Sequence, residues 1–115
     1  MIKIKRVYEA PKTGDGFRVL VDRLWPRGLR KERARIDAWM KEVAPSERLR
    51  KWFGHDLKKC GEFKKKYFEE LDKRQEMVAR LISQAKINAL TLLYASKEER
   101  CNNATALREY LRRKG

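Results

Sequence analysis

The chain has 115 residues, 42% of them hydrophobic and 40% charged, which suits a single domain over residues 1–115 whose core needs neither a disulfide nor a metal. Thirty Lys and Arg against sixteen Asp and Glu give a formal charge of +14, which favours anionic partners. No stretch approaches the roughly 18 apolar residues of a membrane span, so we expect a cytoplasmic protein with no membrane partner.

The excess of positive charge has two interpretations. Charges of both signs are interleaved along most of the chain, which is typical of the ion-pair networks on thermophilic proteins. A field of this sign also attracts nucleic acid, whatever the fold. The sequence alone leaves both open.

The N-terminal half begins with two strands. Ile2 and Ile4 start a partly alternating strand, and Pro11 and Gly16 mark the loop after it. The apolar run 19–21 predicts a second strand that is buried on both faces. The connection between them is too short for a helix, which by itself favours an antiparallel pair.

The loop after the second strand is the first candidate site. It contains Asp22, Arg23, Trp25, Arg27 and Gly28. Guanidinium groups bind carboxylates and phosphates bidentately and stack on aromatic rings, so this loop suits an anionic ligand. Alternatively, Asp22 pairs internally with a neighbouring arginine and Trp25 covers the core.

The middle of the chain is mostly helical. Residues 29–35 predict a short helical turn, and residues 36–43 fit a strand and a helix equally well. Ser46 is placed to cap a helix that ends at Gly54, which puts His55 at a helix junction. His55 is a candidate for proton transfer, or it serves only as a structural hydrogen-bond partner.

Two consecutive helices are expected between residues 57 and 86. Their apolar residues keep helical spacing, and Asp72 with Gln75 has the pattern of a capping box, so we place a break near residue 72. Cys60 is interpreted as a small buried hydrophobic residue. With two cysteines far apart and a single histidine in the chain, no metal site is expected.

The C-terminal segment predicts a strand, a polar loop and a helix. Residues 89–95 are apolar, and either Asn102 or Asn103 can cap the last helix. Ser96 and Lys97 open the loop between them. A loop that joins a strand to a helix N-terminus binds anions in many α/β domains, because free backbone N–H groups converge there. Cys101 is a catalytic candidate as a thiolate near cationic neighbours, with His55 as its candidate partner.

Three motifs in this order resemble the YeaO-like branch of domain of unknown function family 488. They are Val21-Asp-Arg-Leu-Trp-Pro-Arg-Gly28, Trp52-Phe-Gly-His-Asp56, and Leu92-Leu-Tyr-Ala-Ser-Lys97 followed by the asparagine pair. The resemblance implies an α/β fold in which a small, mostly parallel sheet of about three to four strands is flanked by helices. It therefore overrides the argument for antiparallel strands.

Carried over position by position, the resemblance points to twelve residues: Asp22, Arg23, Trp25, Pro26, Arg27, Gly28, Trp52, His55, Ser96, Lys97, Asn102 and Asn103. In the family pattern a histidine commonly stands where this chain has Cys101, which implies a lost or altered activity if that histidine is catalytic in relatives. The resemblance brings no settled reaction.

Our leading hypothesis is a domain that binds an anionic small molecule, a phosphate, nucleotide or carboxylate, at the C-terminal ends of the strands, with or without catalysis. The crevice would be lined by Arg23, Trp25, Arg27, Ser96 and Asn102. The alternatives are a nucleic-acid-binding protein and a non-catalytic interaction module. The sequence predicts no particular cofactor and no oligomeric state.

Overall fold

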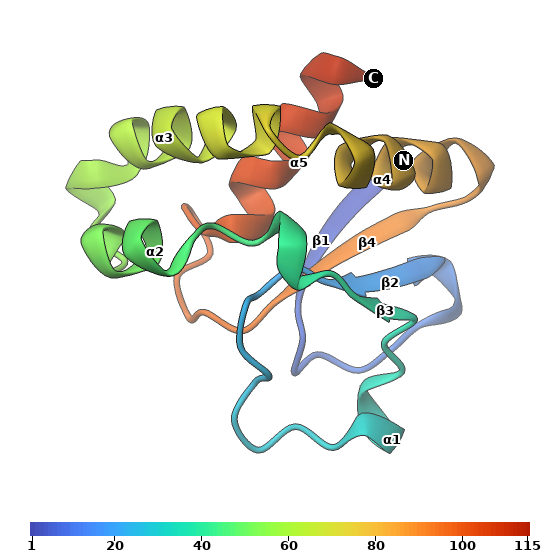
Figure 1. The fold of residues 1–115 in the computed structure, drawn as a ribbon. Helices are drawn as coiled ribbons and strands as arrows, with labels where there is room; N and C mark the ends of the chain where they lie inside the picture. The colour runs from blue at the N-terminus through green and yellow to red at the C-terminus, as the bar shows by residue number, and fades with distance from the viewer.

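A four-stranded, all-parallel sheet forms the centre of the computed structural model, which describes residues 1–115 (Figure 1). Its strands are β1 (Ile2–Arg6), β2 (Phe17–Leu20), β3 (Ala38–Trp39) and β4 (Leu90–Tyr94), in the order β1-β4-β2-β3. The expected small parallel sheet is confirmed. The argument for an antiparallel pair was wrong because β4 pairs with both β1 and β2 and separates them, so their short connection is not a hairpin.

Helices cover one face of the sheet. The helices are α1 (Lys31–Ala34), α2 (Glu47–Phe53), α3 (Cys60–Asp72), α4 (Gln75–Ile87) and α5 (Asn103–Lys114). In Figure 1, α2 to α5 lie on one side of the strands, and the long loop that carries α1 lies on the other. The ends of β2 and β4 both lead into the candidate loops, so the parallel topology brings these loops to one edge of the sheet.

The core has two unequal parts. The larger is a cluster of 19 buried residues, including Val19, Leu92, Phe63 and Leu107, contributed by both the sheet and the helices. The smaller cluster contains Val7, Leu20 and Leu93, against which half-buried side chains of the long loop and β3 pack. Leu20 and Leu93 alternate with core residues of the larger cluster along their strands, so β2 and β4 are buried on both faces, as the apolar runs predicted.

Several predicted boundaries are confirmed and one cap is wrong. Ser46 caps α2, and Gly54 ends it in the left-handed conformation. The break between α3 and α4 lies where it was expected, but no capping box forms there. Asp72 is the last residue of α3 and accepts a hydrogen bond from Tyr110 Oη at 2.6 Å, and the Gln75 amide donates to the Leu71 carbonyl instead.

The ambiguous segment 36–43 forms both a strand and a turn. Its first part is the two-residue strand β3, and Lys41–Val43 is a turn of 3₁₀ helix. Trp39 is half-buried and donates its indole N–H to the Asp22 carbonyl at 2.8 Å. The strand prediction is therefore correct for the first part of this segment, and the helix prediction matches only the 3₁₀ turn in its second part.

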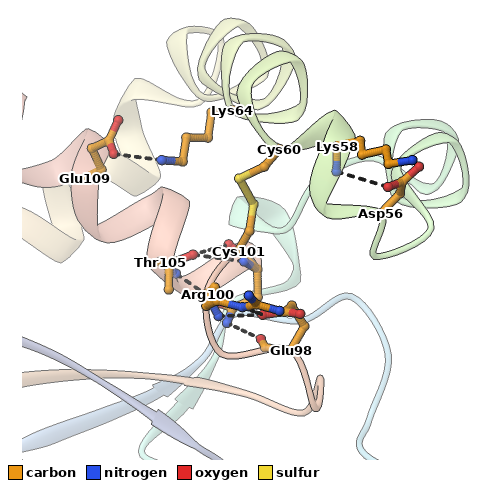
Figure 2. The surroundings of a disulfide bond; sticks show 10 residues. Asp56, Lys58, Cys60, Lys64, Glu98, Arg100, Cys101, Thr105 and Glu109 are labelled. Atoms are coloured by element: carbon orange, nitrogen blue, oxygen red, sulfur yellow. Dashed lines mark hydrogen bonds and ion pairs between the residues drawn. A yellow bond between two sulfur atoms is a disulfide. The ribbon is translucent and has the colours of Figure 1, made fainter.

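A disulfide joins Cys60 at the start of α3 to Cys101 just before α5 (Figure 2). This corrects two predictions. Cys60 is not a free buried hydrophobic residue, and Cys101 has no thiolate available for catalysis in this form. The bond closes a chain segment of 41 positions and ties the polar loop after β4 to the helical layer.

The far face of the sheet holds a buried ion-pair cluster. Asp15 is only 4% exposed and lies between Lys5, at 2.9 Å, and Arg18, at 2.5 Å. Burial by itself raises the pKa of Asp15, but hydrogen bonds from Lys5, the Lys12 backbone N–H and Arg18 outweigh this effect and lower the pKa from 3.8 to about 2. None of the helices is both long and apolar enough to cross a membrane.

Candidate functional site

Asp22 connects the two candidate loops. Its carboxylate accepts a hydrogen bond from the Ala95 backbone N–H at 2.9 Å and another from Asn103 Nδ2 at 3.0 Å. The first donor stands at the end of β4 and the second at the start of α5. The loops after β2 and β4 therefore meet, as predicted, and the Asp22 carboxylate joins them. We call the surface formed by Asp22, His55, Ser96 and Asn103 the rim.

The Asp22 carboxylate is partly shielded from water. This desolvation raises the pKa of Asp22, while the hydrogen bonds from Ala95 and Asn103 and the nearby His55 act in the opposite direction. Neither Arg23 nor Arg27 pairs with it. The alternative that Asp22 pairs with a neighbouring arginine is therefore wrong, because its partners are a backbone N–H and a side-chain amide.

Arg23 is turned away from the rim toward the segment before α2. Its Nε donates to the Pro45 carbonyl at 3.2 Å, and a terminal nitrogen lies 3.5 Å from the Ala44 carbonyl. Carbonyl oxygens occupy only part of the guanidinium hydrogen-bonding capacity. Arg23 thus fixes the Arg-rich loop against the segment that leads into α2.

His55 and Ser96 meet at the rim from different elements. His55 follows α2 with a left-handed φ of 60°, and its Nδ1 lies 3.4 Å from Ser96 Oγ. The same hydroxyl accepts the Glu98 backbone N–H at 3.0 Å, and no hydrogen bond joins His55 to Asp22. Since a relay requires the base to be oriented by a third group, these three side chains do not form a Ser-His-Asp triad.

The N-terminus of α5 is capped from within the chain. Asn102 is the cap residue, and its side-chain oxygen accepts the Thr105 N–H at 2.9 Å while the Thr105 hydroxyl accepts the Asn102 N–H. Asn102 is buried, and its side-chain amide also donates to the Glu98 carbonyl. Of the two predicted caps, Asn102 therefore has a structural role, and Asn103 is left to bind Asp22.

The aromatic and glycine residues of the Arg-rich loop lie away from this rim. Trp25 packs edge-on against Trp39 with 5.3 Å between ring centroids and donates its indole N–H to the Leu29 carbonyl. The exposed Arg27 is held through its backbone carbonyl, which accepts from Tyr8 Oη at 2.7 Å. Gly28 adopts a positive φ of 75° beside a hollow of about 760 Å³ on that face.

Trp52 and Lys97 complete the predicted set. Trp52, on α2, lines a hollow of about 460 Å³ between α2 and α3 and has Lys59 and Lys66 within 5.0 and 5.3 Å of its ring centroid. Lys97 is exposed next to Ser96. None of the five main hollows, of 350 to 760 Å³, is lined by Asp22, Arg23 or Ser96. The predicted residues thus occupy three separate places, and Trp52 and Gly28 line different hollows.

Arg6 also contacts the rim, and nothing in the sequence had indicated this. Arg6, at the end of β1, donates from two guanidinium nitrogens to the Ala95 and Ser96 carbonyls, each at 3.0 Å. It fixes the first turn of the loop after β4 from the opposite side to Asp22. Charged residues are common at strand ends, so Arg6 does not stand out in the sequence. Its contact with the loop after β4 follows from the strand order, in which β1 lies next to β4.

The fold and the rim define a small parallel α/β domain whose strand-end loops are tied together by internal hydrogen bonds and a disulfide, with no assembled nucleophile. The chain belongs to domain of unknown function family 488: the family model described as "Inactive DUF488-N3 subclade" matches residues 1–114.

Similar chains come from two bacterial groups. The protein is 42% identical over 111 residues to the uncharacterized protein YeaO of Escherichia coli, and the match covers 96% of each chain. It is 49% identical over 70 residues to an uncharacterized protein of Mycobacterium tuberculosis, covering 61% of this chain and 59% of the relative. No solved structure matches. The predicted YeaO-like membership is confirmed.

Proposed function

We propose that this protein is a non-catalytic domain that binds nucleic acid through its basic surface. The proposal rests on the observation that most of its Lys and Arg side chains have no carboxylate partner. Eight of the thirty Lys and Arg side chains lie within 4.0 Å of a carboxylate, and the remaining 22 have no such partner. A surface built mainly of ion-pair networks would neutralise more of its cations. Unpaired cations instead suit the closely spaced phosphates of a nucleic acid backbone.

The absence of an assembled catalytic group supports the non-catalytic part of the proposal. Cys101 is held in a disulfide, Asp22 is occupied by two amide donors, and Ser96 lacks an oriented base. The family description also contains the word inactive. A cytoplasmic location, where nucleic acid is available, is part of the proposal. Disulfides inside cells are a known feature of hyperthermophiles, so Cys60–Cys101 does not oppose it.

The direct test is a fluorescence anisotropy titration with labelled duplexes of mixed-sequence DNA and of RNA in 50 mM salt. We expect both to bind with little preference for sequence, since phosphate contacts carry no base information. An acidic polypeptide such as polyglutamate serves as a competitor that has charge but no phosphate. Lack of binding to either duplex, or equal displacement of the duplex by the same charge of polyglutamate, would remove the proposal.

A small anionic ligand at the rim is the second candidate, and one observation favours it. The loops after β2 and β4 converge through Asp22 and Asn103 at the start of α5, and the exposed Lys97 belongs to the second of these loops. A thermal-shift screen with phosphate, nucleotides and carboxylic acids tests this. Lys97→Gln should abolish any stabilisation, and Arg27→Gln, which removes an exposed charge elsewhere, should leave it intact. A shift that is unchanged in Lys97→Gln would exclude the rim.

A further inference from the structure

One groove on the surface combines unpaired guanidinium groups with a defined hollow. It has a volume of about 500 Å³ and lies beside α5 and the edge strand β1, with Lys64 of α3 at its margin. Its lining contains five cations, two carboxylates and one hydrophobic residue, Ile4. The cations are Lys64, Arg100, Arg108, Arg112 and Arg113. This groove is distinct from the rim of Asp22 and His55, none of whose residues line it.

Ion pairing accounts for only part of this charge. Glu109 is shared by Lys64, at 3.2 Å, and Arg113, at 3.1 Å, and the first of these pairs spans α3 and α5 in Figure 2. Arg100 pairs with Glu98 at 3.3 Å. Arg108 and Arg112 have no carboxylate and no hydrogen-bond acceptor within reach. Two guanidinium groups therefore line the groove without a partner.

The spacing of Arg108 and Arg112 makes their juxtaposition unfavourable when no anion is bound. Residues four apart on a helix lie on the same face, so the charges of Arg108 and Arg112 repel each other. Arg108 is half-buried, and this burial, together with the neighbouring charge of Arg112, lowers the pKa of its guanidinium. A phosphate between the two side chains would replace repulsion by charge-assisted hydrogen bonds to both.

The positive track continues beyond the groove. Arg112 also lines a second hollow, of about 350 Å³, which contains Lys86 of α4. Arg108, Arg112 and Lys86 thus follow one another along neighbouring hollows, which fits a chain of phosphates better than a single anion. No aromatic residue lines either hollow, so a base has no ring to stack on.

We infer that the groove along α5 is the phosphate-binding site of this domain, with Arg108 and Arg112 as its principal contacts and a nucleic acid backbone as its ligand. The inference rests on the proposed function and narrows it to one surface. Binding there is independent of base sequence, because the site offers contacts to phosphate alone. The same chemistry would also hold inorganic phosphate or polyphosphate more weakly, and the experiment separates these sources.

The test compares two double variants that remove equal charge. Arg108→Gln/Arg112→Gln empties the groove, and Arg30→Gln/Arg33→Gln removes two cations without ion pairs from the hollow on the far face of the sheet. Binding of a labelled duplex is measured at 100 mM salt. We expect the groove variant to lose affinity by on the order of 50-fold, since each phosphate contact releases about one counterion, and the far-face variant to change much less. The single variant Arg112→Gln, at an exposed position, should show part of the loss if the double variant folds poorly.

The outcomes distinguish this inference from the proposed function. If the parent binds the duplex and both double variants lose equally, the groove is not the site and general nucleic acid binding stands. If the parent fails to bind the duplex, the proposed function is wrong, and tripolyphosphate then serves as the probe. A thermal shift by tripolyphosphate that disappears only in the groove variant would retain the groove as a phosphate site, and its absence in the parent would overturn the groove as well.

Discussion

Asn103 Nδ2 donates a 3.0 Å hydrogen bond to Asp22 Oδ1 across 81 positions of sequence, and it joins the end of β2 to the start of α5. The second Asp22 oxygen accepts the Ala95 N–H. One carboxylate just after β2 therefore satisfies donors at the end of β4, the neighbouring strand, and at the start of α5. The strand-end rim depends on this residue more than on the arginines that follow it.

Replacing Asp22 should destabilise the protein. Asp22→Ala leaves the Ala95 N–H and the Asn103 amide without an acceptor, which costs about 2 kcal/mol of unfolding free energy. Asn103→Ala removes only one donor and should cost less. Urea unfolding followed by circular dichroism gives both values. An Asp22→Ala protein as stable as the parent would show that water replaces the carboxylate at no cost.

The disulfide should contribute strongly to stability. Cys60 and Cys101 are 41 positions apart, and closure of a loop of this size restricts the unfolded chain enough to stabilise the fold by about 4 kcal/mol on the chain-entropy account. Unfolding in urea with and without reductant measures this contribution. The Cys60→Ser/Cys101→Ser variant is the control, because its midpoint should not respond to reductant. An equal response from parent and control would mean that the bond does not form in solution.

Stability should fall in acid because of Asp15. Its pKa is about 2 in the folded protein against 3.8 as the ordinary value, so the unfolded state binds a proton first as the pH decreases. The contribution, about 2 kcal/mol, is fully present above pH 4 and is lost as the pH falls toward 2. Asp15→Asn should lack this loss. Asp22, whose pKa is raised, acts in the opposite direction, so the comparison is between parent and Asp15→Asn at each pH.

Gly16 and Gly61 should respond oppositely to alanine. A Cβ on Gly16 would lie 2.2 Å from the Ala89 carbonyl oxygen, and the residue has a φ of +65°. That oxygen accepts the Phe17 N–H where β2 begins to pair with β4, so Gly16→Ala should cost at least about 2 kcal/mol. Gly61 lies in the first turn of α3 with open space around it, and Gly61→Ala should stabilise by about 0.5 kcal/mol. Thermal unfolding midpoints that moved in the same direction would contradict this difference.

The sequence predicted the fold well where local signals and burial agree. The apolar run 19–21 is buried and Ser46 caps α2, as their residue types indicated, and of the two predicted caps of α5 Asn102 is the one that forms. The disulfide escaped prediction because cysteine spacing carries no information on spatial distance. The order β1-β4-β2-β3 likewise cannot be read from loop lengths, which is why the short first connection was misleading.

The candidate site was predicted only in part. The strand ends predicted correctly that the loops after β2 and β4 meet, because parallel neighbours end at the same edge, but the contact between Asp22 and Asn103 was not predicted. The sequence does not show in which direction a loop side chain points. Trp25 and Arg27 were therefore assigned to the crevice, whereas the loop places them elsewhere. The proposed function rests on which Lys and Arg side chains lie near a carboxylate. The sequence does not show these distances, so this observation needed the structure.

The most direct test of that function is the salt dependence of duplex binding by the parent protein between 50 and 200 mM. If 22 unpaired cations supply the affinity, the logarithm of the binding constant falls linearly with the logarithm of salt concentration. A surface that neutralises about six phosphates would lose roughly 10³-fold in affinity over this range. An affinity that does not change with salt, or no detectable complex at 50 mM, would contradict the account.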